Sequence, residues 1–409
     1  MVVGAGPAGL ATAIELRRRC VADVVVLERE PEAGGIPRHA DHPGFGARDL
    51  RRLLRGPAYA RRYAELARAA GAEIRTEATV TGWTADGALE VTSPTGRATI
   101  AAAAVVLATG CRERPRAARL VPGSRPEGVM TTSTLQQLVH LHHRTVGTRA
   151  VVAGAEHVSF SAVATLAEGG ASTVAMVTEA PRPQSFAAFR AGAALRYRAP
   201  LHPRTRIAAI HGRERVEAVD LEDLDTGATR RVACDTVVFT ADWIPEHELA
   251  VLGGVALDPG TRGPRVDTAL RTTRPGVFAA GNLDHGAEAA DVAALSGRHA
   301  GAAAAAFLND GSWPARVPVE VAPPLHWIAP NTIAPGAGPP PRCRFALRSH
   351  AFLTTPLLAI AQDGRTLWRG RLRALRPGRS AALPAGWIAA VDPAGGPVTV
   401  RVLAARTHE

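Results

Sequence analysis

The chain has 409 residues, 46% of them hydrophobic, which excludes a disordered protein and predicts two or three domains. Its formal charge is +11, but the arginines are spread along the chain and aromatic residues make up only 4%. We therefore interpret the charge as a solvated basic surface and expect no nucleic-acid partner. The four cysteines form no CxxC pair, which argues against a disulfide scaffold, structural zinc or an iron–sulfur cluster. No apolar run suits a transmembrane segment and no leader precedes the first motif, so we expect a cytoplasmic protein.

The first predicted elements are a buried strand at residues 1–3, a glycine-rich turn and a helix through residue 19. Gly4 permits the tight turn, Gly6 lets backbone amides approach a diphosphate, and Gly9 allows the helix and strand to pack closely. A second strand at residues 23–27 ends at Glu28, whose carboxylate can accept hydrogen bonds from a ribose. This GxGxxG pattern in its strand–turn–helix context predicts a dinucleotide site at Gly4, Gly6, Pro7, Ala8, Gly9 and Glu28.

Residues 150–162 repeat this opening and are followed by a helix and a strand that ends at Glu179. Each copy then continues with three short strands and closes with a buried strand. The predicted strands are 79–83, 88–91, 97–100 and 105–110 in the first copy, and 206–210, 216–221, 230–233 and 236–241 in the second.

The second copy has lost its glycines. Ala153, Ala155 and Val158 stand where the NAD(P) fingerprint requires Gly, Gly, and Gly or Ala. If the register instead begins at Gly154, Glu156 falls at a critical position, where a carboxylate would repel a diphosphate. Although Glu179 is still placed to bond a ribose, we expect this copy to accommodate NAD(P)H poorly.

The last hundred residues predict a small all-β domain that serves as an interface or lid. A hairpin is predicted between 357–362 and 365–369 around Asp363-Gly364, and a second between 388–391 and 398–403. The expected fold class is α/β, with two Rossmann-like βαβ dinucleotide-binding domains, each with a three-stranded β-meander, plus this C-terminal domain. Three tryptophans are predicted to lie in its core: Trp327, Trp368 and Trp387.

The sequence resembles the flavoproteins with two dinucleotide-binding domains, the pyridine nucleotide-disulfide oxidoreductase superfamily. The resemblance is carried by the Gly4–Gly9 fingerprint with Glu28, by Ala108-Thr109-Gly110, and by Pro275-Gly276-Val277-Phe278-Ala279-Ala280-Gly281-Asn282 before a helix. It implies an FAD-binding domain at 1–120 and 245–311, a degenerate NAD(P)-binding-like domain at 121–244, and the all-β domain at 312–409. It also implies cofactor contacts at Thr109, Gly110, Asn282 and Val80.

Two of these contacts carry alternatives. Asn282 stands where such proteins usually have Asp, which bonds the flavin's ribityl chain and diphosphate; an amide still donates and accepts hydrogen bonds. Val80 lies where an extended segment passes the adenine, but its side chain could equally be core packing.

The stretch from Gly34-Gly35-Ile36-Pro37-Arg38-His39 to Gly56-Pro57-Ala58-Tyr59 is similar to the FAD-type subunits of heteromeric dehydrogenases for opines, glycine and related amines. This places Gly35 and Arg38 near the cofactor, although Arg38 could be a surface residue, and it implies a second dehydrogenase subunit or another electron acceptor.

We therefore expect an FAD-dependent oxidoreductase, or the FAD-type subunit of one, that accepts hydride from an amine- or hydroxyl-bearing small molecule. Alternatives are an NAD(P)H-dependent flavin reductase and a non-catalytic nucleotide-binding subunit.

No catalytic residue is identified by the sequence. His285 follows Asn282 and is the best acid–base candidate because imidazole titrates near neutrality, but it could be a loop or helix-capping residue. His140, His142 and His143 form a cluster after a helical segment without a matching carboxylate, so we expect no metal site.

Overall fold

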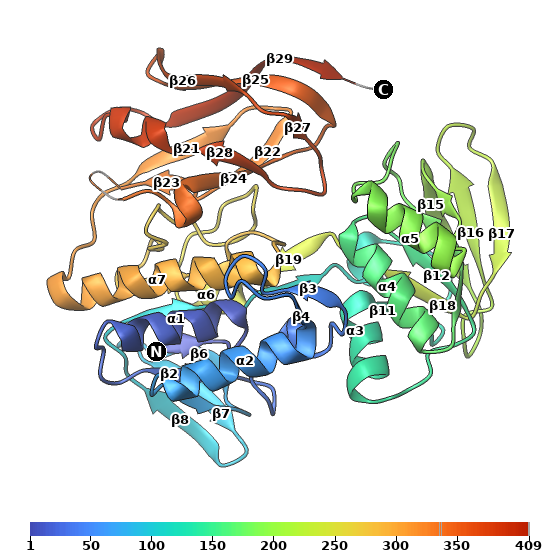
Figure 1. Cartoon of the computed structure of the whole chain (residues 1–409), viewed down its shortest axis with the longest axis horizontal. Coiled ribbons are helices and arrows are strands. Elements are labelled where there is room, and N and C mark those ends of the chain that lie inside the picture. The colour runs from blue at the N-terminus through green and yellow to red at the C-terminus, as the bar shows by residue number, and fades with distance from the viewer. Residues whose placement is uncertain (335, 337, 408–409) are drawn as a thin grey trace. The chain divides into compact units, whose positions relative to one another are not determined.

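The computed structural model describes residues 1–334, 336 and 338–407, which form two compact units (Figure 1). The first unit contains Met1–Arg38, Pro43–Cys111 and the chain from Pro245 onward. The second contains His39–His42 and Arg112–Ile244. The chain passes between them along β10 (Cys111–Glu113) and β19 (Trp243–Pro245), which pair with each other.

A parallel sheet of short, buried, mostly aliphatic strands forms the centre of the first unit (Figure 1). Four of its strands are apolar along their whole length, whereas the edge strand at Glu73–Arg75 alternates, with Ile74 between two exposed charged residues. The order is β20 (Val277–Ala279), β9 (Val105–Leu107), β1 (Val2–Val3), β2 (Val25–Leu27) and β5 (Glu73–Arg75), and the meander is β6 (Thr79–Trp83), β7 (Leu89–Ser93) and β8 (Gly96–Ile100).

Helices α1 (Pro7–Arg18) and α7 (Ala290–Asp310) pack closely because small residues line their contact. A Cβ on Gly297 would lie 1.9 Å from the Ala8 carbonyl oxygen, and the Thr12 hydroxyl donates to the Gly297 carbonyl (2.8 Å). The remaining elements of the first unit up to α7 are η1 (Ile36–Arg38), β3 (Pro43–Phe45), β4 (Leu54–Arg55), α2 (Gly56–Ala69), α6 (Glu248–Leu252) and η4 (Gly281–Leu283).

The rest of the first unit is rich in β-strands and has its own apolar core, as predicted. Trp327 and Trp387 are buried in this region, whereas Trp368 is half-buried. One sheet has the order β23 (Thr332–Ile333), β21 (Val317–Val321), β29 (Val398–Thr407), β25 (Leu353–Gln362) and β26 (Arg365–Arg371), with β27 (Ala374–Leu375) also on β25; the other contains β22 (Leu325–Ala329), β24 (Arg344–Ser349) and β28 (Ala381–Pro384), and η5 (Pro341–Cys343) precedes β24.

The hairpin around Asp363-Gly364 is confirmed, but the hairpin predicted between 388–391 and 398–403 is wrong. Residues Gly386–Ala390 form the 3-10 helix η6, which buries Trp387 against Phe345 (ring centroids 5.0 Å apart). Both hydrogen-bonding edges of β29 are taken by β21 and β25, so no edge is left for a hairpin partner.

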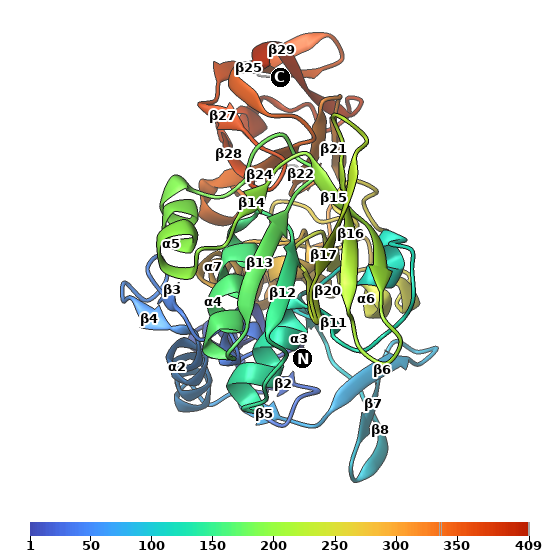
Figure 2. The same cartoon turned by 90° about the vertical axis from the view of Figure 1, so that its right-hand side faces the viewer.

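The second unit repeats the parallel architecture (Figure 2). Strand β12 lies between β18 and β13 with parallel registers such as Val152 opposite Val238 and Met176. The sheet order is β11 (Val129–Thr131), β18 (Thr236–Phe239), β12 (Arg149–Ala153), β13 (Ser172–Val177) and β14 (Leu201–His202); the meander is β15 (Thr205–His211), β16 (Ala218–Asp223) and β17 (Thr229–Ala233); the helices are η2 (Arg116–Arg119), α3 (Thr132–Gln136), η3 (Gln137–Leu141), α4 (His157–Glu168) and α5 (Ala187–Tyr197). The predicted α/β fold with two βαβ domains is confirmed.

Candidate functional site

The glycine turn between β1 and α1 has no room for a side chain at Gly4 or Gly9. Gly4 has φ +98°, and a Cβ there would lie 2.5 Å from the Ala108 carbonyl oxygen. A Cβ on Gly9 would lie 1.8 Å from the carbonyl oxygen of Gly4. At Gly6 the only near atom is the Cα of Gly35, 4.0 Å away, so the missing side chain leaves open space there. The turn therefore offers the backbone access that a diphosphate requires.

The first turn of α1 is free of groups that would compete with an anion. Its N-cap, Gly6, has no side chain, Pro7 occupies the first helical position, and no acidic residue lies in the first turn. Ala8 is buried. Backbone N–H groups at an uncapped helix N-terminus attract phosphate through hydrogen bonding and the helix dipole.

Glu28 is held in place at the end of β2. Its Oε2 accepts a hydrogen bond from the Ala5 N–H (2.8 Å) and its Oε1 accepts from the Glu30 N–H (3.0 Å). The residue is 7% exposed. A carboxylate has about four acceptor sites, so two remain for ribose hydroxyls. The turn and Glu28 together fit the adenosine diphosphate half of FAD.

Gly35 and Arg38 flank the same turn. Gly35 adopts φ +61°, and a Cβ there would lie 2.8 Å from the Cα of Gly6. The Arg38 side chain is 13% exposed and its Nη2 lies 3.3 Å from Glu32 Oε2. The Nε of Arg38 is buried and has no hydrogen-bond partner among the described residues. This donor is available to a phosphate or another acceptor, so a cofactor role for Arg38 stays a prediction.

Thr109 and Gly110 lie just after β9, at the carboxyl end of the sheet. The Thr109 hydroxyl donates to the Glu246 carbonyl (2.8 Å), and the Glu246 N–H donates to the Gly110 carbonyl (2.9 Å). Both residues thus fasten the point where the chain re-enters the first unit. Val80 lies on β6 opposite Val91 and its half-buried side chain packs against the core, so contact with adenine would use its backbone.

The amide of Asn282 closes a short loop. Its Nδ2 donates to the Glu288 carbonyl (3.2 Å) and its Oδ1 accepts from the Glu288 N–H (2.8 Å). An amide has a second N–H and a second lone pair, so one donor and one acceptor remain for a ribityl chain. Asn282 therefore both shapes the loop and retains capacity for the cofactor.

Two titratable residues in this loop carry unpartnered buried atoms. Asp284 is 4% exposed and its Oδ1 has no hydrogen-bond partner among the described residues; burial raises the pKa of its carboxyl to about 8. His285 lies against Trp327 (ring centroids 4.7 Å apart), and burial lowers the pKa of its imidazole to about 4. His285 is thus a neutral loop residue packed on a tryptophan. The sequence analysis did not identify Asp284 as a candidate, because a single Asp at this position belongs to no distinctive pattern.

The segment before α2 is fastened to the start of α7. The Arg48 Nη1 donates to Asp291 Oδ1 (3.0 Å) and the Arg48 N–H donates to Asp291 Oδ2 (3.1 Å). The next residue, Asp49, accepts from the hydroxyls of Tyr59 (2.6 Å) and Tyr63 (2.7 Å), both of which are buried. Burial and this carboxylate raise the pKa of both phenols, so they remain hydroxyl donors. The anchoring role of Asp49 was also missed.

The corresponding helix of the second unit is capped by its own side chains. The Oε2 of Glu156 accepts from the Ala155 N–H (3.0 Å), and Ser159 completes a capping box with Glu156 at the first turn of α4. The Ser159 hydroxyl also lies 2.7 Å from that of Thr240. A Cβ on Gly154 would lie 1.9 Å from the Thr240 hydroxyl oxygen, so the space is filled.

A buried arginine lies beside this cap. Arg119 donates to the carbonyls of Thr240 (2.8 Å) and Ala241 (2.9 Å). Burial raises the pKa of Glu156, while hydrogen bonds and then the Arg119 charge oppose the rise. The N–H groups that would bind a coenzyme diphosphate already bind an internal carboxyl group.

The histidine cluster has a carboxylate neighbour that the sequence did not reveal. His140 Nε2 lies 2.9 Å from Glu168 Oε2, so the expectation of no matching carboxylate is wrong. The two meet because α4 brings Glu168 near from 28 residues away. Within the described part of the chain, no three His, Cys, Asp or Glu residues could hold a metal ion.

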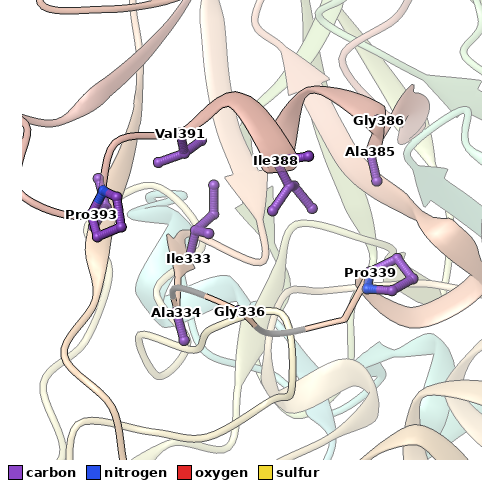
Figure 3. Close-up of a pocket in the computed structure, with 11 residues that line it drawn as sticks. Ile333, Ala334, Gly336, Pro339, Ala385, Gly386, Ile388, Val391 and Pro393 are labelled. Carbon is purple, nitrogen blue, oxygen red and sulfur yellow. The ribbon is translucent and has the colours of Figure 1, made fainter.

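A cavity of about 560 Å³ lies in the C-terminal β-rich region (Figure 3). Its lining consists of aliphatic side chains, prolines and glycines, including Ile333, Ile388 and Val391. No titratable side chain among the described residues lines it, so it offers shape without acid–base chemistry.

No helix in the described ranges is long and apolar enough to cross a membrane.

Comparisons with known proteins agree with this geometry. The family model described as pyridine nucleotide-disulphide oxidoreductase matches residues 1–297. The thioredoxin reductase of Treponema pallidum is 28% identical over 294 residues, which cover 69% of this chain and 88% of that protein. One of the subunits of the opine oxidase of Agrobacterium tumefaciens is 28% identical over 344 residues, which cover 76% of this chain but only 65% of that protein.

A solved structure shares the fold. The crystal structure of T. acidophilum thioredoxin reductase superposes with a TM-score of 0.62 at 22% identity, covering 76% of this chain and 98% of that one. With one open glycine turn, an anchored Glu28 and a family match across both units, the chain belongs to the pyridine nucleotide-disulphide oxidoreductase family, is a flavin-dependent oxidoreductase, and uses FAD as its cofactor.

Proposed function

We propose that the chain is the FAD-type subunit of a heteromeric dehydrogenase that accepts hydride from an amine- or hydroxyl-bearing small molecule. In this proposal the electrons leave to a second subunit or another acceptor and not to NAD(P)⁺. The observation that carries it is the contrast between two helix N-termini: α1 begins at an uncapped glycine turn, whereas Glu156 caps α4. The likeness to the opine oxidase protein, whose name describes it as one subunit of an oxidase, supports it.

The chain's own residues have distinct parts in this proposal. Glu28 and the α1 turn would hold the adenosine diphosphate portion, and Asn282 would bond the ribityl chain. Bound FAD supplies the two-electron chemistry, while the protein positions it and controls access. Disulfide reduction is not supported, because the cysteines form no CxxC pair and Cys20, Cys111, Cys234 and Cys343 are all free thiols.

Anaerobic titration of the FAD-loaded protein tests the proposal. We expect NADH and NADPH to leave the flavin absorbance unchanged, while dithionite bleaches it fully and a panel of opines, amino acids and hydroxy acids contains a compound that bleaches it. Rapid bleaching by NADH or NADPH would contradict the electron exit and favour a flavin reductase. A purified chain that binds nucleotide but no flavin would favour the non-catalytic alternative.

A matched pair of variants separates the helix cap from other causes. Glu156→Ala removes the internal carboxyl from α4 while Glu168→Ala removes a carboxyl from the other end of the same helix. If the cap excludes the coenzyme, weak NAD(P)H binding should appear only in the Glu156→Ala protein. Equal coenzyme binding by the wild-type protein and both variants would show that the cap has no such effect.

A further inference from the structure

The excess positive charge is concentrated at the C-terminus, contrary to the even spread expected from the sequence. Residues 312–409 hold twelve arginines and four acidic residues, so they carry eight of the eleven net charges. Within them, residues 364–391 contain six arginines and no Asp or Glu. This stretch begins at the turn that leads into β26.

Strand β26 lies at the edge of its sheet and pairs only with β25 among the described strands (Figure 1). Arg369 is opposite Ala359 and Arg371 is opposite Leu357. A Cβ on Gly370 would lie 2.3 Å from the Trp368 ring, so the intervening face of the strand is covered by that half-buried ring. Because side chains alternate along a strand, the arginines share the other face, where both are exposed.

Four arginines in and after β26 have no carboxylate partner among the described residues: Arg365, Arg369, Arg371 and Arg373. Arg371 Nη1 donates to the Thr355 carbonyl (3.1 Å), Arg365 donates to the Ala390 carbonyl, and the side chains of Arg369 and Arg373 make no hydrogen bond to a described residue. All four are exposed. Arg369 and Arg371 share one face of β26, where their guanidinium groups can form bidentate bonds with carboxylates supplied from outside. The bulge between Ile360 and Ala361 places Arg365 on the face of Trp368 instead.

The chemistry of the edge favours a protein partner. No exposed aromatic platform for nucleic-acid bases accompanies the arginines on this described edge, since the Trp368 ring covers Gly370. Leu403 is the only exposed large hydrophobic residue among the described residues after 311, which gives a bilayer little to bind. A second copy would bring the same positive charges together.

We propose that the open edge formed by β26 and the following turn is the docking surface for an acidic face of a protein partner, the second subunit of the dehydrogenase. This rests on the proposed function, in which such a subunit receives the electrons. A charged edge also prevents unwanted strand pairing, but Glu would serve that purpose as well as Arg. Charge reversal therefore separates the two roles.

The test uses the full FAD-loaded chain and a short labelled polyglutamate peptide as the probe, followed by fluorescence anisotropy at low and high salt. The variant is Arg369→Glu/Arg371→Glu. Its matched control is Arg97→Glu/Arg230→Glu, which makes the same net charge change at exposed positions on two other edge strands, β8 and β17. We expect the β26 variant to raise Kd about tenfold or more at low salt, and the control to raise it less than about twofold.

Equal loss in both double variants would show that the peptide senses only net charge and would overturn the proposal. Unchanged binding in the β26 variant would overturn it too, since the arginines would then be only protective. A DNA duplex or phosphatidylserine vesicle that binds more tightly than the peptide through the same residues would also overturn it. Arg369→Gln/Arg371→Gln replaces the Glu variant if that protein fails to fold. None of these readouts depends on electron transfer, so they fail separately from the flavin titration.

Discussion

Replacing Asp284 with Asn should remove a specific pH dependence of stability. In the unfolded chain this carboxyl loses its proton near pH 3.8, but in the folded protein burial holds its pKa at about 8. Between these values the folded state binds one more proton than the unfolded state, so stability falls as the pH rises. The amide of Asn has no such titration and keeps nearly the same shape.

The size of the effect follows from the pKa shift. Each pH unit inside the window changes the free energy of unfolding by about 1.4 kcal/mol, so going from pH 5 to pH 7 costs about 2.7 kcal/mol. This free-energy difference does not depend on the exact pKa of Asp284 in the folded state, as long as that pKa lies well above 7. The wild-type protein should therefore lose about 2.7 kcal/mol more than Asp284→Asn over the same interval.

Urea unfolding at pH 5, 6 and 7, followed by tryptophan fluorescence with FAD in excess, measures the difference. The exposed Asp23 provides the control, because Asp23→Asn should leave the pH dependence of the wild type unchanged. Parallel curves for the wild type and Asp284→Asn would refute the reasoning. They would mean that the carboxyl finds a hydrogen-bond donor and ionises normally.

Three further substitutions test the site. Glu28→Ala removes the acceptor of two backbone hydrogen bonds and should weaken FAD binding about tenfold or more, measured by flavin fluorescence on titration; unchanged affinity would contradict its role. Gly9→Ala places a Cβ 1.8 Å from a carbonyl oxygen and should yield no flavin-loaded protein, whereas Gly192→Ala, in open space, should keep the melting temperature or raise it. Asp49→Ala removes the charged acceptor of two buried tyrosine hydroxyls and should cost about 3 kcal/mol in urea unfolding; a loss below about 1 kcal/mol would show that water replaces it.

Local sequence patterns predicted the dinucleotide-binding halves well. The turn around Gly4 and Gly9 has steric requirements that only glycine meets, so its spacing identifies the geometry. The meander strands were also predictable, because turn residues separate runs of alternating side chains. Duplication strengthened both predictions, since each half independently showed the same order of elements.

Features that depend on long-range pairing were not predictable in this way. β29 joins β21 across 79 positions, from Val319 to Val398, and no local signal indicates that partner. The cap at Glu156 could be suspected as an electrostatic obstacle, but its bonds to Ser159 and the backbone required coordinates. Asp284 is approached by a segment distant in the chain, since a Cβ on Gly263 would lie 2.4 Å from the Asp284 carbonyl oxygen, and no local pattern indicates this neighbour.

The internal cap on α4 has a consequence for how the second unit responds to its surroundings. A domain that binds an anionic ligand from solution becomes more stable as the ligand concentration rises. The gain in stability grows with the logarithm of that concentration. Here the carboxyl group of Glu156 belongs to the chain itself, so its effective concentration at the helix N-terminus is constant. Under the proposed function, the second unit gains no stability from NAD(P)H, so its melting temperature should not change with the concentration of that coenzyme.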